Sequence, residues 1–314
     1  EDGIRDCLLS RGLGDVYKRQ ARSRAPAWSC LIATKITRTK FVTTFHGTYN
    51  FKSNIKKFYN SVMVRSDLII AGSNFIFSHI KENYSEYLSD RKKLLSIFRG
   101  INTDYYDAST TLEADEDNLF KSWELIVGKK IILLPGRLTA WKGQEMFLEA
   151  LNKVNIQLGN DAFIAVILGN DQGRDLYKKK LIRLVEQYRL TKQIRFIDHC
   201  KNMPLAYKIS DIVISASIKP EAFGRVSVEA QSMQKMIVAS NLGGSNETVI
   251  DGKTGILFEA GNSDELSEKI IKVMNMDPNE ISKMGNNGRE NAVKKFNVEK
   301  MCFSTYSEYK KLFN

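Results

Sequence analysis

Paired cysteines and long apolar runs are both missing from this 314-residue sequence. No apolar run approaches the roughly 20 residues that cross a membrane as a helix, and the first residues contain no apolar segment typical of a signal peptide. The four cysteines are far apart and form no CxxC pair: Cys7, Cys30, Cys200 and Cys302. Neither a disulfide framework nor a zinc site is therefore indicated, and we expect reduced thiols and a cytoplasmic location.

Acidic residues are fewer than basic residues in this sequence. The sequence has 47 lysines and arginines against 36 aspartates and glutamates, a formal net charge of +11. Such a balance suits a basic solvated surface, nucleic-acid binding, or attraction to anionic lipid or a phosphorylated substrate. The sequence contains no zinc-finger, RNP or recognition-helix pattern, so we expect no nucleic-acid partner. A phosphate-bearing substrate and an anionic membrane surface explain the charge better, and a merely basic surface stays the alternative.

Motifs for metals and dinucleotides are absent as well. His199 and Cys200 are adjacent, but no partner motif accompanies them, so we expect no metal site. No GxGxxG occurs in the sequence, which argues against an NAD-type Rossmann enzyme.

Apolar patterning predicts an α/β protein with two domains. The 43% hydrophobic content is enough for two cores. Buried strands alternate with helices of about 10–15 residues across residues 129–273, which predicts a doubly wound parallel sheet. We therefore assign residues 127–297 to a C-terminal Rossmann-like domain. Residues 21–126 also contain strand and helix patterns, including a helix at 74–84 with Ser73 as its N-cap.

Residues 1–20 do not fit this pattern. They lack a clear period of either 2 or 3.6. We interpret them as a non-native flank and expect the native N-terminal portion to be missing, with a divergent natural N-terminus as the alternative.

The segment 211–229, DIVISASIKPEAFGRVSVE, combines a strand, a loop and the start of a helix. Its β-branched run at 212–214 suits a strand buried on both faces. Further on, Val226, Ala230 and Met233 recur at helical spacing, which predicts a helix that lays one face on a core.

Two carboxylates frame this turn, with Glu221 in the loop and Glu229 in the helix. Eight residues along a helix span about 12 Å, so the pair is too far apart to share a proton. The two side chains are better placed to bind separate parts of one extended ligand. The loop joins a strand's carboxyl end to a helix N-terminus, which is the usual ligand position in open α/β sheets.

A second strand-to-helix loop carries two cations. GKKIILLPGRL predicts a buried strand that ends at Pro135 and Gly136, and an amphipathic helix follows with Phe147 on its apolar face. Arg137 and Lys142 lie in the loop between them. Two cations there can neutralise a diphosphate, with helix N–H groups adding partial positive charge. A pair of surface cations is the alternative.

His46 directly follows the predicted strand 41–45 and precedes a glycine, in the string TFHG. A lone histidine is usually structural, but the carboxyl end of a strand is a site position. An imidazole there can hydrogen-bond a ligand. We do not assign it as a general base.

Four strings together carry a resemblance to one family. The chain resembles retaining glycosyltransferases of family 4, the glycosyl transferases group 1, in these strings: KPEAFGRVSVEA with its Glu-x7-Glu spacing, GRLTAWKG, TFHG and GGSNETV. The resemblance implies the GT-B fold, α/β with two Rossmann-like doubly wound domains facing a cleft. Residues 21–126 would then be an incomplete, N-terminally truncated acceptor-side domain. Residues 127–297 would bind the nucleotide sugar, and 298–314 would pack back on the first domain.

The resemblance also implies a role for each candidate residue. Arg137 and Lys142 would bind the donor's diphosphate and stabilise it as it leaves, and Glu229 would accept the ribose hydroxyls. Glu221 would bind the sugar and stabilise an oxocarbenium-like transition state, and His46 would face the sugar. The other implied donor contacts are Ala222, Phe223, Gly224, Arg225 and Val226. The implied nucleobase loop is Ile197, Asp198 and His199, although it lacks the family's usual glycine.

Such an enzyme moves a sugar from a nucleotide-diphosphate sugar to a glycan or lipid-linked acceptor, without a cofactor or a metal. The strings RAPAWS, TFHGTYN and SNFIFSHI resemble bacterial lipopolysaccharide-core glycosyltransferases. This likeness implies a role in cell-envelope polysaccharide or lipopolysaccharide synthesis, in the cytoplasm with peripheral contact to the inner membrane. Two alternatives stay open: a catalytically incomplete fragment that binds nucleotide sugars, and an epimerase of the GT-B fold.

Overall fold

The computed structural model describes three stretches of the chain: residues 18–88, 93–110 and 113–313. They form two compact units. Unit 1 consists of the described part of Glu1–Gly100 with Lys295–Asn314, and unit 2 is Ile101–Lys294. The predicted flank, residues 1–20, lies outside the described residues except for 18–20, which begin a strand.

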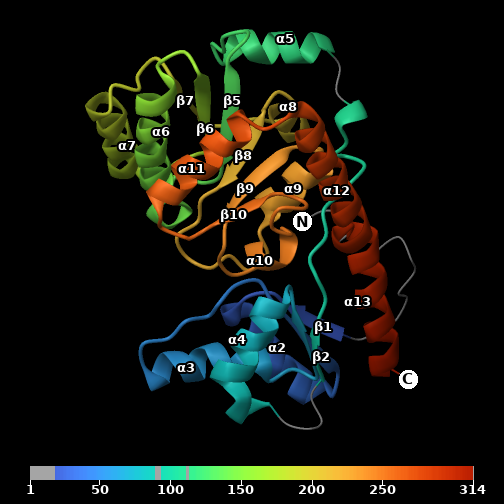
Figure 1. Ribbon diagram of the computed structural model, residues 1–314. Helices are drawn as coiled ribbons and strands as arrows, with labels where there is room; N and C mark the ends of the chain where they lie inside the picture. The colour runs from blue at the N-terminus through green and yellow to red at the C-terminus, as the bar shows by residue number, and fades with distance from the viewer. Residues whose placement is uncertain (1–17, 89–92, 111–112, 314) are drawn as a thin grey trace. The chain divides into compact units, whose positions relative to one another are not determined.

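Unit 1 contains a four-stranded parallel sheet in the order β1-β2-β3-β4, of which Figure 1 labels β1 and β2. Its strands are β1 (Lys18–Ala21), β2 (Lys40–Phe45), β3 (Leu68–Ala71) and β4 (Lys93–Ser96). Its helices are α2 (Arg24–Thr37), α3 (Asn54–Asn60), α4 (Asn74–Tyr84) and α13 (Val298–Phe313). Val42, Leu68 and Ile70 form the core of the sheet together with Tyr309 of α13. The last helix of the chain therefore completes the core of the first unit.

Unit 2 contains a six-stranded parallel sheet in the order β10-β9-β8-β5-β6-β7. Its strands are β5 (Lys130–Pro135), β6 (Phe163–Leu168), β7 (Ile194–Ile197), β8 (Ile212–Ser215), β9 (Met236–Ser240) and β10 (Ile256–Phe258). Its helices are α5 (Glu113–Ser122), α6 (Gln144–Leu158), α7 (Asp175–Gln187), α8 (Met203–Lys208), α9 (Arg225–Ser232), α10 (Ser245–Thr248), α11 (Ser263–Met274) and most of α12 (Pro278–Phe296). No helix in the described ranges is both long and apolar enough to cross a membrane.

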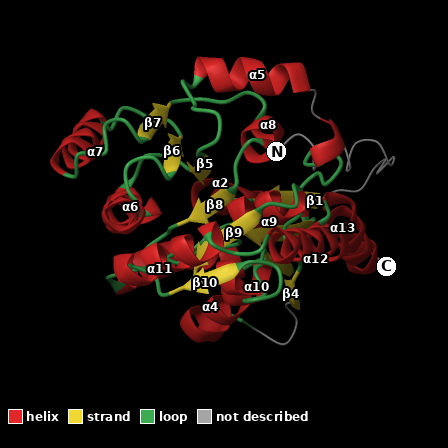
Figure 2. Ribbon diagram, turned by 45° about the horizontal axis from the view of Figure 1, so that its top comes forward, coloured by secondary structure: helices red, strands yellow, loops and turns green. Residues whose placement is uncertain are grey.

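Strand β5 is buried on both faces, because helices lie on both sides of the strands (Figure 2). Ile132 and Leu134 belong to the core cluster that includes residues of α6, α7 and α11. Ile131 and Leu133 belong to the cluster that includes residues of α8 and α9. Successive side chains of a strand point to opposite faces, so a strand covered on both faces reads as a continuous apolar run. The predicted doubly wound sheet is confirmed.

The strand order of unit 2 reverses at β5, where the chain adds β6 and β7 on one side and β8 to β10 on the other. Ile132 pairs with Ile212 at this point, so the loops that follow β5 and β8 leave the sheet side by side. The Ile218 N–H donates to the Trp141 carbonyl across the two loops, at 2.9 Å. Gly143 has φ +76°, and a Cβ there would lie 1.9 Å from the Ala216 carbonyl oxygen. Only glycine allows this approach.

Replacing Gly143 with alanine tests whether this close approach matters. Gly173 is the matched control, because it has φ +78° and open space around a Cβ. Left-handed backbone alone costs a non-glycine residue about 1–2 kcal/mol, which is the loss expected for Gly173→Ala. Gly143→Ala adds a backbone clash and is expected to lower the free energy of unfolding by at least about 3 kcal/mol. Equal losses in chemical denaturation of the two variants would contradict this interpretation.

Candidate active site

The loop after β5 carries both predicted cations. Arg137 is exposed, and within the described ranges its guanidinium group has no hydrogen-bond or ion-pair partner. Its carbonyl accepts a hydrogen bond of 2.9 Å from the Gln144 side chain, which ties the loop to the first residue of α6. Lys142 ends a short 3₁₀ helix, Ala140–Lys142, and its Nζ lies 4.6 Å from the centre of the Trp141 ring.

Lys142 and Glu221 form an ion pair across the two neighbouring loops. The distance between Lys142 Nζ and Glu221 Oε1 is 2.7 Å, and both side chains are largely covered, with 14% and 12% exposure. The Ser217 hydroxyl donates to the same carboxylate oxygen. The acidic side chain predicted to bind a sugar is therefore held by a cation predicted to bind phosphate, and this ion pair was not predicted from the sequence.

The glycine-rich turn after β9 packs against the backbone of the loop that follows β8. The Gly244 N–H donates to the Glu221 carbonyl at 2.8 Å. A Cβ on Gly244 would lie 2.6 Å from the Phe223 backbone, so only glycine permits this contact. Three successive loops of the sheet, after β5, β8 and β9, thus meet at one edge around Glu221.

Glu229 lies on α9 and is buried, with 6% exposure. Its Oε2 accepts a 2.7 Å hydrogen bond from the Tyr207 hydroxyl, and Tyr106 hydrogen-bonds the same carboxyl group. Burial raises the pKa of Glu229, and the hydrogen bond from Tyr207 and the charge of Arg225 oppose that rise. The result is a carboxyl group held in one orientation by two phenols.

Arg289 of α12 holds the segment that carries Tyr106. Its Nη1 donates to the carbonyls of Thr103 and Tyr106, at 2.7 and 2.6 Å. Its Nη2 lies 2.5 Å from the Asp107 carboxylate. The sequence did not predict Arg289, Tyr106 and Tyr207 as site residues, because each reaches the site through a contact distant in sequence and none belongs to a local motif.

The remaining donor candidates of the sequence fall at two places. Ala222, Phe223, Gly224, Arg225 and Val226 form the junction between the β8 loop and α9, with Phe223 buried and Arg225 exposed. Strand β7 ends at Ile197, and Asp198 and His199 follow it. β7 is an edge strand, two positions from β5 in the sheet. Asp198 pairs there with Lys178 at 2.6 Å. The structure thus brings the first group next to Glu221 and leaves the second at the edge of the sheet.

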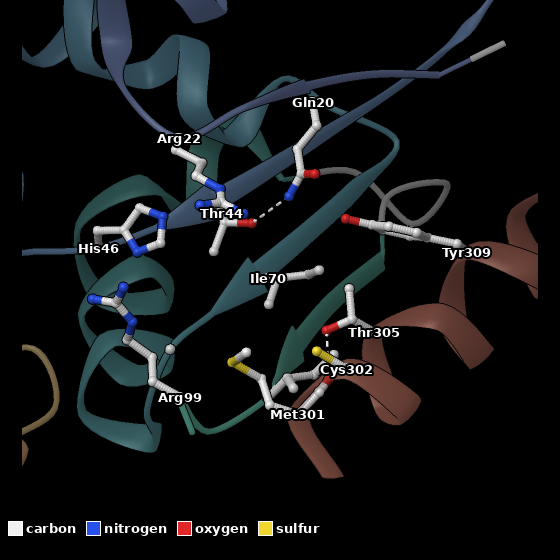
Figure 3. Close-up of a pocket in the computed structure, with 12 residues that line it drawn as sticks. Gln20, Arg22, Thr44, His46, Ile70, Arg99, Met301, Cys302, Thr305 and Tyr309 are labelled. Atoms are coloured by element: carbon white, nitrogen blue, oxygen red, sulfur yellow. Dashed lines mark hydrogen bonds between the residues drawn. The ribbon is translucent and has the colours of Figure 1, made fainter. Parts of the chain in front are cut away.

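His46 lies in unit 1, directly after β2, and lines a cavity at the carboxyl ends of the strands (Figure 3). Both ring nitrogens are buried, and neither has a hydrogen-bond partner among the described residues. Burial lowers the pKa of His46 to about 4, with smaller contributions from the positive charges of Arg99 and Arg22. The imidazole is therefore neutral at physiological pH. The described residues contain no group of three or more His, Cys, Asp or Glu side chains that could hold a metal ion.

Comparison with known proteins places these loops in a family. The family model of glycosyl transferases group 1 matches residues 115–291, more than half of the chain. The crystal structure of a glycosyltransferase from Rickettsia africae is 32% identical to this chain, with a TM-score of 0.87, and the match covers 100% of this chain and 81% of that one. This chain belongs to the glycosyl transferases group 1 family. Its two parallel-sheet units have the Rossmann-like architecture of GT-B glycosyltransferases, as predicted.

Three other proteins are similar to this chain at lower sequence identity. An uncharacterized glycosyltransferase of Methanocaldococcus jannaschii is 29% identical over 84% of this chain, which spans 63% of that protein. Spore coat protein SA of Bacillus subtilis is 25% identical, over 91% of this chain and 76% of that protein. HepE of Anabaena, solved in complex with UDP-glucose, shares the fold with a TM-score of 0.81 at 24% identity, over 93% of this chain and 78% of that one.

The charge state of His46 can be measured directly, because the chain has only three histidines. An unfolded histidine binds its proton near pH 6.5, whereas His46 in the folded chain does so at about 4. Acidification through that window therefore lowers the free energy of unfolding. A histidine NMR titration is expected to show no His46 transition between pH 7 and 5.5, and a midpoint near 6.5 would contradict the burial argument.

Proposed function

We propose that this chain acts as a retaining, family 4 glycosyltransferase that takes a sugar from a nucleotide-diphosphate donor. The observation that carries the proposal is the meeting of cationic and acidic side chains at the strand-order reversal. Arg137 and Lys142 follow β5, and Lys142 lies 2.7 Å from Glu221 of the neighbouring loop. Open α/β sheets bind ligands at this kind of position. The HepE structure with UDP and glucose supports uridine diphosphate as a first probe.

The donor's diphosphate would bind the loop after β5. Arg137 presents an exposed guanidinium group there, which can bind phosphate oxygens through two parallel hydrogen bonds. Lys142 is held beside the same loop by Glu221, and a diphosphate would compete for that ammonium group. Both cations would stabilise the negative charge that develops on the leaving diphosphate, which is usually the largest catalytic contribution. Release from Lys142 would leave Glu221 free to bind the sugar's hydroxyls.

The ribose and the sugar would bind the acidic side of the site. Glu229 is a buried acceptor oriented by two phenols, which suits the paired hydroxyls of a ribose. Backbone groups of residues 222–226 would complete the phosphate and sugar pocket, and residues 197–199 would lie near the nucleobase. His46 would contact the transferred sugar as a neutral imidazole, able to donate or accept a hydrogen bond.

Calorimetric binding of uridine diphosphate and uridine tests these roles. Hydrogen bonds to charged groups contribute about 1.5–3 kcal/mol, so Arg137→Gln should weaken uridine diphosphate binding about 10- to 150-fold and leave uridine binding unchanged. Glu229→Gln should weaken the binding of both ligands. Arg183→Gln is the matched control, because this exposed arginine lies on α7. Wild-type affinity for the diphosphate in both site variants would refute the proposed donor site.

A membrane-facing role would explain an apolar and basic surface on unit 1. Ile32 and Ile36 of α2 and Ile55 and Phe58 of α3 are between 51% and 83% exposed. The two helices are neighbours, since the Trp28 ring contacts Phe58 at 5.6 Å between centroids. Exposed lysines accompany them, Lys35, Lys52 and Lys56. Apolar side chains next to cations are typical of surfaces that bind anionic lipid, which suits a lipid-linked acceptor at the inner face of the inner membrane.

Vesicle co-sedimentation tests this surface. The wild-type chain should bind vesicles that contain anionic phosphatidylglycerol more strongly than vesicles of phosphatidylcholine alone. Ile55→Asp should reduce the bound fraction several-fold, because it places a negative charge at the lipid surface. Leu176→Asp is the control, since Leu176 is equally exposed, at 85%, but belongs to unit 2. Equal binding of the two variants would contradict the proposed surface.

Product analysis separates transfer from the two alternatives. A transferase with a role in cell-envelope polysaccharide or lipopolysaccharide synthesis should extend a glycan or lipid-linked acceptor. Proton NMR of the new glycosidic linkage should show the anomeric configuration of the donor. An epimerase would change the free nucleotide sugar without an acceptor, and a donor-binding fragment would bind uridine diphosphate and form no product.

A further inference from the structure

The cavity in unit 1 that His46 lines contains further polar side chains with no role in the proposed donor site. It measures about 50 Å³ and lies between the carboxyl ends of the four strands and helix α13. Its lining includes Arg22, His46, Gly72, Arg99 and Cys302. One water molecule needs about 10–15 Å³, so this space suits a group the size of a few waters.

The charged side chains that line this cavity, Arg22 and Arg99, are both positive. Arg22 follows β1 and Arg99 follows β4, and parallel strands bring their carboxyl ends to the same edge of a sheet. Figure 3 shows both guanidinium groups on the His46 side of the cavity, with α13 opposite. Both lie close enough to His46 for their charges to lower its pKa. Among the described residues that line the cavity there is no carboxylate.

The position of the Arg99 side chain is constrained by the backbone that it crosses. Its Cγ would lie 3.1 Å from a Cβ added at Gly72, so the arginine stem crosses the end of β3 at a point where a side chain would crowd it. His46 adds a third polar group to the cavity, with both ring nitrogens buried and unpartnered in the described part of the chain. Buried polar groups normally have partners, and a neutral imidazole offers one N–H donor.

We infer that this cavity is an oxyanion site, in which Arg22, Arg99 and the His46 N–H bind a phosphate or carboxylate group carried by the acceptor. The inference rests on the proposed transferase function, because it assigns the anion to the acceptor side of that reaction. It narrows the acceptor class to glycans or lipid-linked sugars that carry a negative charge. Guanidinium groups bind both phosphate and carboxylate through paired hydrogen bonds.

Histidine NMR tests the site with defined probes. Chains carrying ¹³C-labelled histidine are titrated with inorganic phosphate, acetate, glucose 6-phosphate, glucuronate and, as the neutral control, glucose. The phosphate or carboxylate probes should shift the His46 signal saturably and raise its titration midpoint above about 4, because a nearby anion favours the imidazolium form. Glucose should do neither. The relative affinities of the phosphate and carboxylate probes identify the preferred anion, and His79 and His199 serve as internal references.

Three arginine variants and one control decide the assignment. Arg22→Gln and Arg99→Gln should each weaken anion binding at least about tenfold, and Arg22→Lys should retain part of it. Lys40→Gln should not change it, because Lys40 is exposed at the start of β2, away from the carboxyl ends of the strands. Arg22→Gln keeps the test valid if Arg99→Gln fails to fold, which the His79 signal reports. Unchanged anion affinity in the folded variants, or equal shifts of His199 and His46, would overturn the inference.

Uridine diphosphate separates this site from the donor site. Its calorimetric binding should be unchanged in Arg22→Gln, because the residues proposed to bind the nucleotide and its diphosphate belong to unit 2. Loss of the phosphate effect on His46 at saturating uridine diphosphate would assign the anion to the donor and overturn the acceptor assignment. Failure of diphosphate binding with an intact anion effect would count against the proposed function alone.

Discussion

The reversal of strand order at β5 is the constraint on which the candidate site depends. Because β5 and β8 are neighbours in the sheet but far apart in sequence, their loops leave the same edge together. The approach is close enough that position 143 must be glycine. The ion pair between Lys142 and Glu221 then joins the two loops at 2.7 Å, with both side chains largely covered. A buried charge that loses its partner is strongly unfavourable, so the pair keeps both side chains at the edge where a diphosphate would bind.

A second network acts on the other side of the same loop. Glu229 is buried and accepts a hydrogen bond from Tyr207, and Tyr106 reaches it from a segment that Arg289 fixes through two carbonyls. The carboxylate is thus oriented by residues from three separate elements. The site therefore combines an exposed cation, Arg137, and a paired cation, Lys142, on one loop with a hydrogen-bond acceptor, Glu229, that is already oriented on α9. Such preorganisation favours tight binding, because few side chains lose conformational freedom when a ligand binds.

Much of the fold could be predicted from local patterns. The continuous apolar run of β5 follows from burial on both faces, and Ser73 accepts a hydrogen bond from the Ile76 N–H at 3.2 Å, as expected of an N-cap. Strand β1 was missed, because its four polar and short residues KRQA carry no periodic signal and pair with β2 alone at the edge of the sheet.

The site could be predicted only in part. Parallel strands place their carboxyl ends at one edge, so Arg137, Lys142 and Glu221 could be expected near each other from sequence. The direct pairing of Lys142 with Glu221 could not, because it depends on the register of β5 against β8. The contacts of Glu229 with Tyr207 and Tyr106 depend on the packing of α8 and the segment before α5 against α9, which no local motif encodes.

A crystal structure of this chain with bound uridine diphosphate is the most direct test of the central claim. The account predicts the diphosphate over the loop after β5, with its oxygens bound by Arg137 and Lys142 and the ribose hydroxyls donating to Glu229. It also predicts that the ion pair between Lys142 and Glu221 is broken or lengthened from 2.7 Å. A nucleotide bound away from the β5 and β8 loops, with that ion pair intact, would contradict the account.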